Sequence, residues 1–274
     1  MSIKLIVLDL DDTLLRDDHS ISNRTKAALM KAQECGIKVA LASGRSTFGM
    51  VASAEELSLA EYGGFILSFN GGKIMNYQLK EELFSSSMPL TAVKKLYEIS
   101  QREGVFIHTY VGNEIITETD NPYTKIASGL SNLPINLVTS FVEGVKEEVG
   151  KVLMCGDPDK MKDVEAKLKT ELADDFSVMR SKPFFVEFTE KGVTKGTSLS
   201  HLIQKYGIKR EEVMAIGDSY NDQEMIKFAG LGVAMGNAPD DIKELADHVT
   251  DTNMNDGVAK VVEEFVLRDL VKNE

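Results

Sequence analysis

Two aspartates near the N-terminus, Asp9 and Asp11, have the chemical type and the spacing of groups that bind a metal ion or react with a substrate. They follow residues 5–8, an apolar run with the length and composition of a strand buried on both faces. Aspartate is poor in strands and costly to desolvate, so these carboxylates need a cation, hydrogen-bond donors or water beside them. Magnesium is often held by one or two carboxylates together with a substrate phosphate, and the pair predicts such a site. A solvated acidic turn after a strand has the same pattern.

The elements around these aspartates alternate between strands and helices. Strands are expected at 37–41, 65–69, 213–216 and 231–235, and helices at 23–35, 46–57, 194–206, 239–246 and 258–267, with a further helix ending near 228. Such alternation indicates a parallel sheet wound in right-handed βαβ units. The sequence therefore predicts an α/β core, a Rossmann-like doubly wound parallel sheet. In open sheets of this kind ligands bind beyond the carboxyl ends of the strands.

The pattern changes between residues 84 and 188, where hairpins are interspersed with helices. Paired strands are expected at 105–110 with 113–119 and at 177–180 with 184–189, a strand at 151–155, and helices at 90–102 and 158–172. Residues 121–149 show no clear pattern. This mixture predicts an inserted α+β domain at 84–188, within a discontinuous core domain formed by 1–83 and 189–274.

Composition narrows the possible classes of protein. The net charge of −12 argues against a nucleic-acid partner, because nucleic-acid binding requires a basic patch. No apolar run is long enough to cross a membrane, and Asp9 interrupts the N-terminal apolar stretch too early for a signal peptide. We therefore expect a cytoplasmic protein with no membrane partner. The two cysteines, Cys35 and Cys155, lack the spacing of a zinc ribbon or a disulfide scaffold.

Polar groups recur at the ends of other expected elements. They are Ser43 and Gly44 after the second strand, Lys195 at a helix start, and Asp218, Asn221 and Asp222 after a later strand. Taken singly, each is typical of a turn or of a solvated charge. Together with Asp9 and Asp11, they bring two sets of groups to one edge of the sheet. The carboxylates could bind Mg²⁺, and the cation, the hydroxyl and the amide donors could bind a phosphate.

These segments resemble the four motifs of the haloacid dehalogenase (HAD) superfamily, whose members are mostly phosphatases. The matching stretches, in the order of the family, are residues 9–14, 43–45, 195–196 and 217–222. The inserted domain lies between Ser43 and Lys195, as the α/β cap does in the Cof-like subfamily, and Asn70-Gly71-Gly72 also resembles a segment common there. Ser219 departs from the pattern, since these proteins often have glycine at that position, so the backbone of this loop could differ.

The resemblance implies that a small phosphorylated metabolite, a sugar phosphate or a phosphorylated cofactor, is hydrolysed with Mg²⁺ through an aspartyl-phosphate. Asp9 would be the nucleophile, and Asp11 the general acid and then the general base. The other implied roles are metal binding by Asp9, the Asp11 carbonyl and Asp218, phosphate binding by the Leu10 and Gly44 amides, Ser43, Lys195 and Asn221, and support from Asp222.

Substrate specificity is expected in the inserted domain, because the core of such a protein contacts only the phosphoryl group. Glu187 is a candidate substrate contact there, and packing within an ordinary strand is its alternative role. A phosphohexomutase and a non-catalytic phosphometabolite sensor remain alternative functions. A dehalogenase is disfavoured, because Asp11 would protonate a departing alcohol and a departing halide needs no proton. The oligomeric state is left open.

Overall fold

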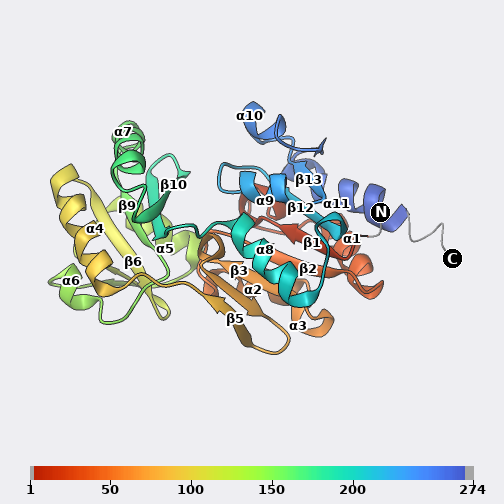
Figure 1. The fold of residues 1–274 in the computed structure, drawn as a ribbon, viewed down its shortest axis with the longest axis horizontal. Helices are drawn as coiled ribbons and strands as arrows, with labels where there is room; N and C mark the ends of the chain where they lie inside the picture. Colours follow the sequence, from red (N-terminus) through yellow and green to blue (C-terminus); the bar gives the residue numbers. More distant parts are fainter. Residues whose placement is uncertain (1–2, 269–274) are drawn as a thin grey trace. The chain divides into compact units, whose positions relative to one another are not determined.

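The computed structural model describes residues 3–268 and divides into two compact units. The first, called the core unit here, comprises the described residues of Met1–Ser43, Met50–Phe84 and Thr194–Glu274. The second, called the cap unit, comprises Gly44–Gly49 and Ser85–Val193. Each unit contains one sheet with helices packed against it (Figure 1).

The core unit is built on an eight-stranded sheet with the order β14-β13-β12-β1-β2-β3-β4-β5. Its parallel strands are β1 (Leu5–Leu8), β2 (Lys38–Ala42), β3 (Phe65–Ser68), β12 (Val213–Gly217), β13 (Leu231–Ala234) and β14 (His248–Val249). At one edge, β4 (Lys73–Asn76) runs antiparallel to β3 and is followed by β5 (Glu81–Ser85). The expected doubly wound α/β sheet is confirmed, with β1 at its centre.

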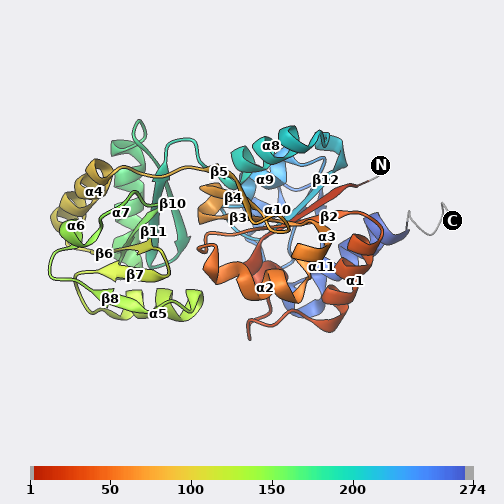
Figure 2. The same cartoon turned by 90° about the horizontal axis from the view of Figure 1, so that it is seen from below.

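Alternate side chains of β1 enter different layers of the core. Ile6 and Leu8 pack on one side of the sheet, and Leu5 and Val7 pack on the other. The first side is covered by α1 (Asn23–Glu34), α2 (Val51–Glu56) and α11 (Gly257–Val262), and the second by α8 (Lys195–Tyr206) and α9 (Gln223–Phe228). Figure 2 shows these two helical layers above and below the core sheet. Burial on both faces explains why the strand is a continuous apolar run.

Three core helices differ from expectation, and one of them is α10 (Asp240–Lys243), which is shorter than the helix expected at 239–246. The segment expected as one helix at 46–57 contains a 3₁₀ turn at Phe48–Met50 before α2, because the Ser46 hydroxyl accepts a hydrogen bond from the Gly49 amide and so favours a local turn. The closing helix changes from α11 to a π-type turn at Glu263–Leu267. The remaining short core elements are α3 (Leu59–Tyr62), a π-type turn at Leu10–Leu14, and 3₁₀ turns at Phe69–Gly71, Arg210–Glu212 and Asn253–Asn255.

The cap unit contains a six-stranded sheet with the order β10-β11-β9-β6-β7-β8. Its strands are β6 (Phe106–Val111), β7 (Glu114–Thr117), β8 (Ile135–Leu137), β9 (Val152–Cys155), β10 (Phe176–Lys182) and β11 (Phe185–Glu190). All neighbours pair antiparallel except β7 and β8. The expected hairpins β6–β7 and β10–β11 are present. Strand β8 lies in the stretch for which the sequence shows no clear pattern.

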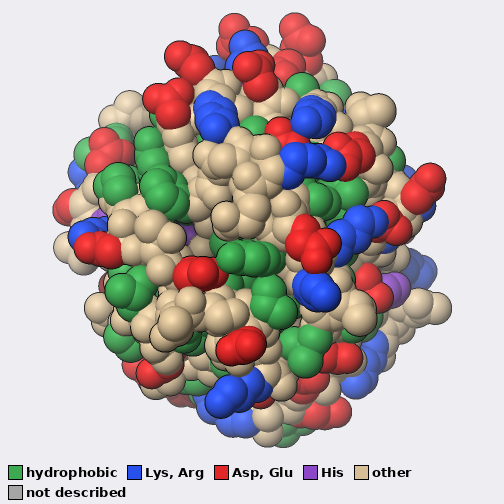
Figure 3. Space-filling model, turned by 90° about the vertical axis from the view of Figure 1, so that its left-hand side faces the viewer, with side chains coloured by type: hydrophobic (Ala, Val, Ile, Leu, Met, Phe, Trp, Pro, Cys, Tyr) green, Lys and Arg blue, Asp and Glu red, His purple; other side chains and the backbone are tan. Residues whose placement is uncertain are grey.

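Helices cover parts of both faces of the cap sheet. They are α4 (Leu90–Glu103), α6 (Phe141–Gly144) and α7 (Pro158–Glu171) on one face, and α5 (Pro122–Ser131) on the other. Acidic and basic side chains are intermingled over the surface that Figure 3 shows. No helix within residues 3–268 combines the length and the apolar character that crossing a membrane requires.

Candidate active site

Asp9 stands directly after β1, at the carboxyl end of the central strand. Its amide donates to the Ile216 carbonyl of β12 at 3.0 Å, so the neighbouring strand fixes its backbone. The chain then turns tightly: the Leu15 amide donates to the carbonyl of the fully buried Leu10 at 2.8 Å, and Asp12 adopts a left-handed φ of 65°. Asp11 lies half-buried in this turn. The turn therefore presents Asp9 and Asp11 at the end of the strand.

Lys195 bridges two of the predicted carboxylates. Its Nζ atom lies 2.5 Å from Oδ1 of Asp9 and 2.6 Å from Oδ1 of Asp222, and its side chain is fully buried. Burial works against the ammonium form, but the charges of Asp222 and Asp9 outweigh it and raise the pKa of Lys195 above its ordinary value. Lys195 is therefore a permanent cation at this edge of the sheet.

Asp222 also organises the loop that carries Asp218. Its Oδ2 atom accepts hydrogen bonds from the amides of Asp218 at 3.1 Å and Ser219 at 3.0 Å. Gly217 is required for this arrangement, because a Cβ there would lie 2.5 Å from the Cβ of Asp222. The Thr13 hydroxyl donates to Oδ1 of Asp218 at 2.8 Å, a contact that fixes the carboxylate. Thr13 belongs to the first motif, but the sequence alone assigns it no role.

One carboxylate oxygen from each of Asp9, Asp218 and Asp222 lies within 4.8 Å of the others. Burial, together with the nearby carboxylates, raises the pKa of Asp9 well above its ordinary value of 3.8, although Lys195 acts in the opposite direction. Burial and the charge of Asp222 raise the pKa of Asp218 to about 7. The Asp9 and Asp218 carboxyls are therefore costly to ionise at this place, and a bound divalent cation would favour their charged forms. Mg²⁺ prefers oxygen ligands, and three carboxylate oxygens lie close together here, so these residues fit that ion.

Ser43, Asn70 and Asn221 are linked by hydrogen bonds. Ser43 follows β2, its amide donates to the Leu67 carbonyl at 2.9 Å, and its carbonyl accepts from the Asn70 amide at 2.9 Å. The Asn221 side-chain amide donates to Oδ1 of Asn70 at 3.0 Å. Asn70 is fully buried and has a left-handed φ of 55°. It joins the second and fourth motif segments, a role that its position after β3 in an Asn-Gly-Gly turn could have suggested.

The start of α8 is fixed against the turn that contains Asn70. The Ser198 hydroxyl donates to the Gly71 carbonyl at 2.6 Å. Gly71 has a φ of 95°, and a Cβ there would lie 2.3 Å from the Ser198 hydroxyl oxygen, so the close approach requires glycine. Since Lys195 begins α8, this contact helps to set the position of its ammonium group.

Gly44 and Glu187, two further predicted residues, belong to the cap unit rather than to the cluster around Asp9. The Gly44 carbonyl accepts a hydrogen bond from Nζ of Lys151 at 2.5 Å. Glu187 is 3% exposed, and its two carboxylate oxygens accept hydrogen bonds from Lys151 at 3.1 Å and from the Ser181 hydroxyl at 2.6 Å. Both contacts are made within the cap unit and hold the Glu187 side chain in place there.

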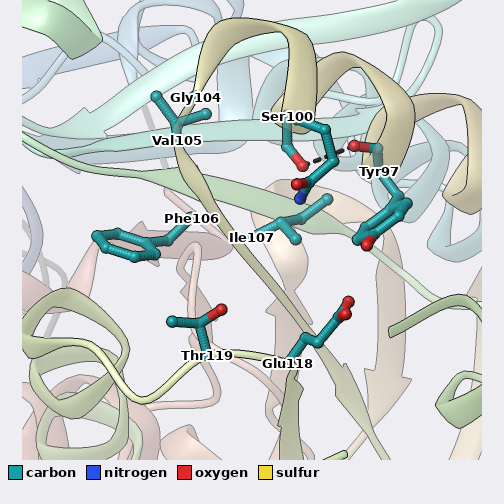
Figure 4. Close-up of a pocket in the computed structure, with 9 residues that line it drawn as sticks. Tyr97, Ser100, Gly104, Val105, Phe106, Ile107, Glu118 and Thr119 are labelled. Atoms are coloured by element: carbon teal, nitrogen blue, oxygen red, sulfur yellow. Dashed lines mark hydrogen bonds between the residues drawn. The ribbon is translucent and has the colours of Figure 1, made fainter. Parts of the chain in front are cut away.

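A pocket of about 220 Å³ opens elsewhere in the cap unit (Figure 4). It is lined by Tyr97, Ser100, Gln101, Gly104, Val105, Phe106, Ile107, Glu118 and Thr119. Glu118 supplies the one carboxylate in this set, which includes no lysine, no arginine and no residue of the four motifs. This pocket therefore does not suit a phosphate group.

Comparisons with known proteins agree with this geometry. A family model described as haloacid dehalogenase-like hydrolase matches residues 6–262. The crystal structure of a haloacid dehalogenase-like hydrolase from Bacteroides thetaiotaomicron is 45% identical and has a TM-score of 0.89, over 96% of this chain and 99% of that one. The sugar phosphatase BT4131 is 29% identical with a TM-score of 0.82, over 96% of this chain and 98% of that one.

A curated relative from Bacillus subtilis bears the name 5-amino-6-(5-phospho-D-ribitylamino)uracil phosphatase YcsE. It is 31% identical over 275 residues, which is 97% of each chain. The family match includes the segments that contain Asp9 and Asp218 and the whole inserted unit. The two relatives named as phosphatases match this chain over nearly its whole length. The chain therefore belongs to the haloacid dehalogenase-like hydrolases, in the Cof-like group that its motifs resemble, and it is a phosphatase.

Proposed function

We propose that this phosphatase hydrolyses a small phosphorylated metabolite, a sugar phosphate or a phosphorylated cofactor, with Mg²⁺ and through a phosphorylated Asp9. The observation that carries the proposal is the buried contact of Lys195 with Asp9 and Asp222, beside Asp218. It gathers a nucleophile, a fixed cation and a set of metal ligands at the carboxyl ends of neighbouring parallel strands, where open α/β sheets bind their ligands.

In the first step a carboxylate oxygen of Asp9 forms a bond to phosphorus, and the bond from phosphorus to the oxygen of the leaving alcohol breaks. Asp11 gives its proton to that oxygen, so the product leaves as a neutral alcohol. One residue, Leu10, separates the two aspartates on the same turn. Burial is the main cause of the raised pKa of Asp9, and the charge of Asp11 adds to it.

In the second step a water molecule attacks the phosphorus of the phosphorylated Asp9. Asp11, now a carboxylate, takes a proton from that water, and the bond between phosphorus and Asp9 breaks. Inorganic phosphate leaves, and both aspartates return to their starting state. One group thus serves as the acid and then as the base, as two successive transfers at the same phosphorus require.

Asp9, the Asp11 carbonyl and Asp218 would hold the magnesium ion. When bound, Mg²⁺ supplies positive charge that lets an anionic nucleophile approach an anionic phosphate. Asp222 would orient Lys195 and the loop of Asp218, because its two carboxylate oxygens already accept hydrogen bonds from these groups.

The phosphate oxygens would be bound by donors from separate segments. They are the Leu10 and Gly44 amides, the Ser43 hydroxyl and the Lys195 ammonium, with Asn221 supporting them through Asn70. Preorganised donors of this kind stabilise the charge that develops during phosphoryl transfer, and they need no rearrangement at the moment of reaction. Glu187 of the cap unit is kept as a candidate for selecting the leaving group.

The names of the relatives support a small substrate. One solved structure is called a sugar phosphatase, and one curated relative is named for a phosphoribitylamino-uracil, so both name small phosphorylated molecules. The net charge of −12 and the intermingled charges on the surface that Figure 3 shows support a metabolite rather than a nucleic acid. We place the protein in the cytoplasm, where such metabolites occur.

The proposal is tested by measuring inorganic phosphate released from phosphorylated sugars, nucleotides, flavin mononucleotide and pyridoxal phosphate, with Mg²⁺ and after chelation. We expect release from at least one small monoester and loss of release after chelation. Undiminished release from metal-free protein contradicts the metal requirement. Isomerisation of a hexose phosphate without phosphate release assigns a phosphohexomutase instead, and binding without turnover assigns a sensor.

A further inference from the structure

We propose that Lys151 and Glu187 form a positioning pair that fixes the backbone of Gly44, and through it the phosphate-binding segment that follows Ser43. The inference rests on the proposed function, because the orientation of Gly44 matters to the reaction if its amide binds the substrate phosphate. The pair acts through Gly44 and does not itself contact the phosphoryl group.

Lys151 has an unusual environment for a lysine. It lies directly before β9, and its carbonyl accepts a hydrogen bond from the Thr109 hydroxyl of β6 at 2.6 Å, so its backbone is fixed to the cap sheet. Its side chain is 3% exposed, and a buried ammonium is costly unless it is paired. The partners of Nζ are Oε2 of Glu187 at 3.1 Å and the Gly44 carbonyl at 2.5 Å.

Glu187 holds the ammonium in place. It projects from β11, and its other oxygen, Oε1, accepts from the Ser181 hydroxyl of β10 at 2.6 Å. The Tyr110 ring lies beside the pair, with its centroid 5.2 Å from Nζ of Lys151. Glu187 therefore balances the charge of Lys151, and the strands of the cap sheet hold both side chains in place. The Gly44 carbonyl is the other hydrogen-bond partner of Lys151 among the contacts described.

The hydrogen bond to Gly44 constrains more than one atom. The Gly44 carbonyl and the Arg45 amide belong to one planar trans peptide, so they point in opposite directions. A donor that fixes the carbonyl therefore fixes the plane of the Gly44–Arg45 peptide. The Gly44 amide lies in the preceding peptide, whose Ser43 carbonyl accepts a hydrogen bond from the Asn70 amide at 2.9 Å, so Lys151 and Asn70 together hold the peptides on both sides of Gly44. Because the Lys151 donor is charged, its hydrogen bond is stronger than one between neutral groups. Glycine is the residue whose backbone most needs such a constraint, since no side chain restricts it.

The segment from Gly44 to Gly49 is arranged to transmit this constraint. It is covalently continuous with Ser43 of the core unit, yet its contacts group it with the cap unit. Its own hydrogen bonds, from Arg45 Nη1 to the Gly49 carbonyl at 3.2 Å and from the Gly49 amide to the Ser46 hydroxyl at 3.3 Å, close it into a compact loop. Lys151 then attaches the first residue of this loop to the cap sheet.

The test is the double substitution Lys151→Met with Glu187→Met. Lys151→Met alone would leave the Glu187 carboxylate buried without its cation and could fail to fold. Replacing both members of a buried ion pair by apolar groups of similar size is often tolerated. We expect the double variant to fold, to lose about 10- to 100-fold in kcat with a much smaller change in KM, and to exchange the amide hydrogens of residues 44–49 faster.

Two further variants separate positioning from general stability. Lys151→Arg, made as a single substitution, keeps a cationic donor beside Glu187. It should retain most of the wild-type kcat and most of the exchange protection at 44–49. Lys160→Met is the matched control, because Nζ of Lys160 also donates to a backbone carbonyl in the cap unit, that of Gly104 at 2.9 Å. It should leave both measurements unchanged.

The outcomes distinguish this inference from the proposed function. Wild-type kcat and wild-type exchange at 44–49 in the double variant would overturn the inference, and so would a fall in kcat with no change in exchange. A wild-type protein that releases no phosphate from any substrate overturns the proposed function instead. Amide exchange then still decides whether Lys151 and Glu187 hold Gly44.

Discussion

The Nζ atom of Lys195 lies 2.5 Å from Oδ1 of Asp9, although 186 positions of sequence separate the two residues. The doubly wound core explains this proximity, because α8 packs against the side of the sheet that contains Leu5 and Val7 of β1. Asp9 follows that strand and Lys195 begins that helix, so packing of the apolar face brings the two charges together. The core thus positions the groups that the proposed reaction uses.

Replacing Lys195 with methionine should remove both activity and stability. The substitution leaves the buried carboxylates of Asp9 and Asp222 without their cation, and breaking a buried ion pair in this way costs about 3 to 5 kcal/mol. We expect the free energy of unfolding in urea to fall by about that amount in metal-free protein, and kcat to fall by at least about 100-fold. Lys4→Met, which removes an exposed lysine paired with Glu212, should change neither measurement appreciably. An active Lys195→Met variant of normal stability would contradict the assigned role.

Asp222→Asn should weaken Mg²⁺ binding although Asp222 is proposed to act through its neighbours. Asparagine keeps one acceptor oxygen but cannot maintain the charged contact with Lys195 together with both amide contacts at Asp218 and Ser219. Loss of such a supporting contact costs about 10- to 100-fold in metal affinity. Titration calorimetry with Mg²⁺ measures the change. Asp240→Asn removes the same charge at a side chain that is 97% exposed, and it should bind Mg²⁺ as the wild type does.

Asp11→Asn should separate binding from turnover. Asparagine has nearly the same shape and keeps the backbone carbonyl, so Mg²⁺ and substrate still bind, but it cannot give or take the proton. The expected fall in kcat is about 10²- to 10⁴-fold. Asp12→Asn is the neighbouring control, because asparagine tolerates the left-handed φ of 65° at that position. Full activity of Asp11→Asn in a phosphate-release assay would rule out the proposed acid and base.

The stability of the cap unit should fall in mild acid because of His108. Burial, with a smaller contribution from the charge of Lys151, lowers the pKa of His108 from 6.5 to about 3. A base whose pKa is lowered by folding binds a proton more readily when unfolded, so its contribution to stability is full above pH 6.5 and is lost as the pH falls toward 3. The loss at pH 5 is about 2 kcal/mol.

Urea unfolding at pH 7 and pH 5, followed by circular dichroism, measures this loss. His108→Gln should reduce the difference between the two pH values, since glutamine does not titrate. His201→Gln, at an exposed position, should preserve the difference. An unchanged difference in His108→Gln would show that another group controls the acid sensitivity.

The sequence predicts the core because its signals are local. The apolar run of β1 predicts a buried strand. Asp9 and Asp218 indicate where strands end, because carboxylates are unfavourable inside strands. Parallel strands place their carboxyl ends at one edge, so the approximate position of the cluster follows from element order. Lys195 could be placed in the same way, since Thr194 caps the helix that begins there.

Contacts that depend on tertiary packing could not be predicted in this way. The hydrogen bond from Thr13 to Asp218 and the junction between Asn70 and Asn221 join residues far apart in sequence, and no local pattern marks either pair. The same holds for Lys151, whose partner Gly44 lies 107 positions away. Strand β8 was missed because its three residues are largely exposed and carry no alternating pattern.

The central claim is that Asp9 carries the phosphoryl group, and chemical trapping of the intermediate tests it most directly. The protein is mixed with a substrate that it hydrolyses, quenched in acid, reduced with borohydride, and digested for mass spectrometry. Borohydride converts an aspartyl-phosphate to homoserine, so we predict homoserine at position 9 in the wild type and none in Asp9→Asn. Homoserine at another aspartate, or a trapped phosphoryl group in Asp9→Asn, would contradict the account.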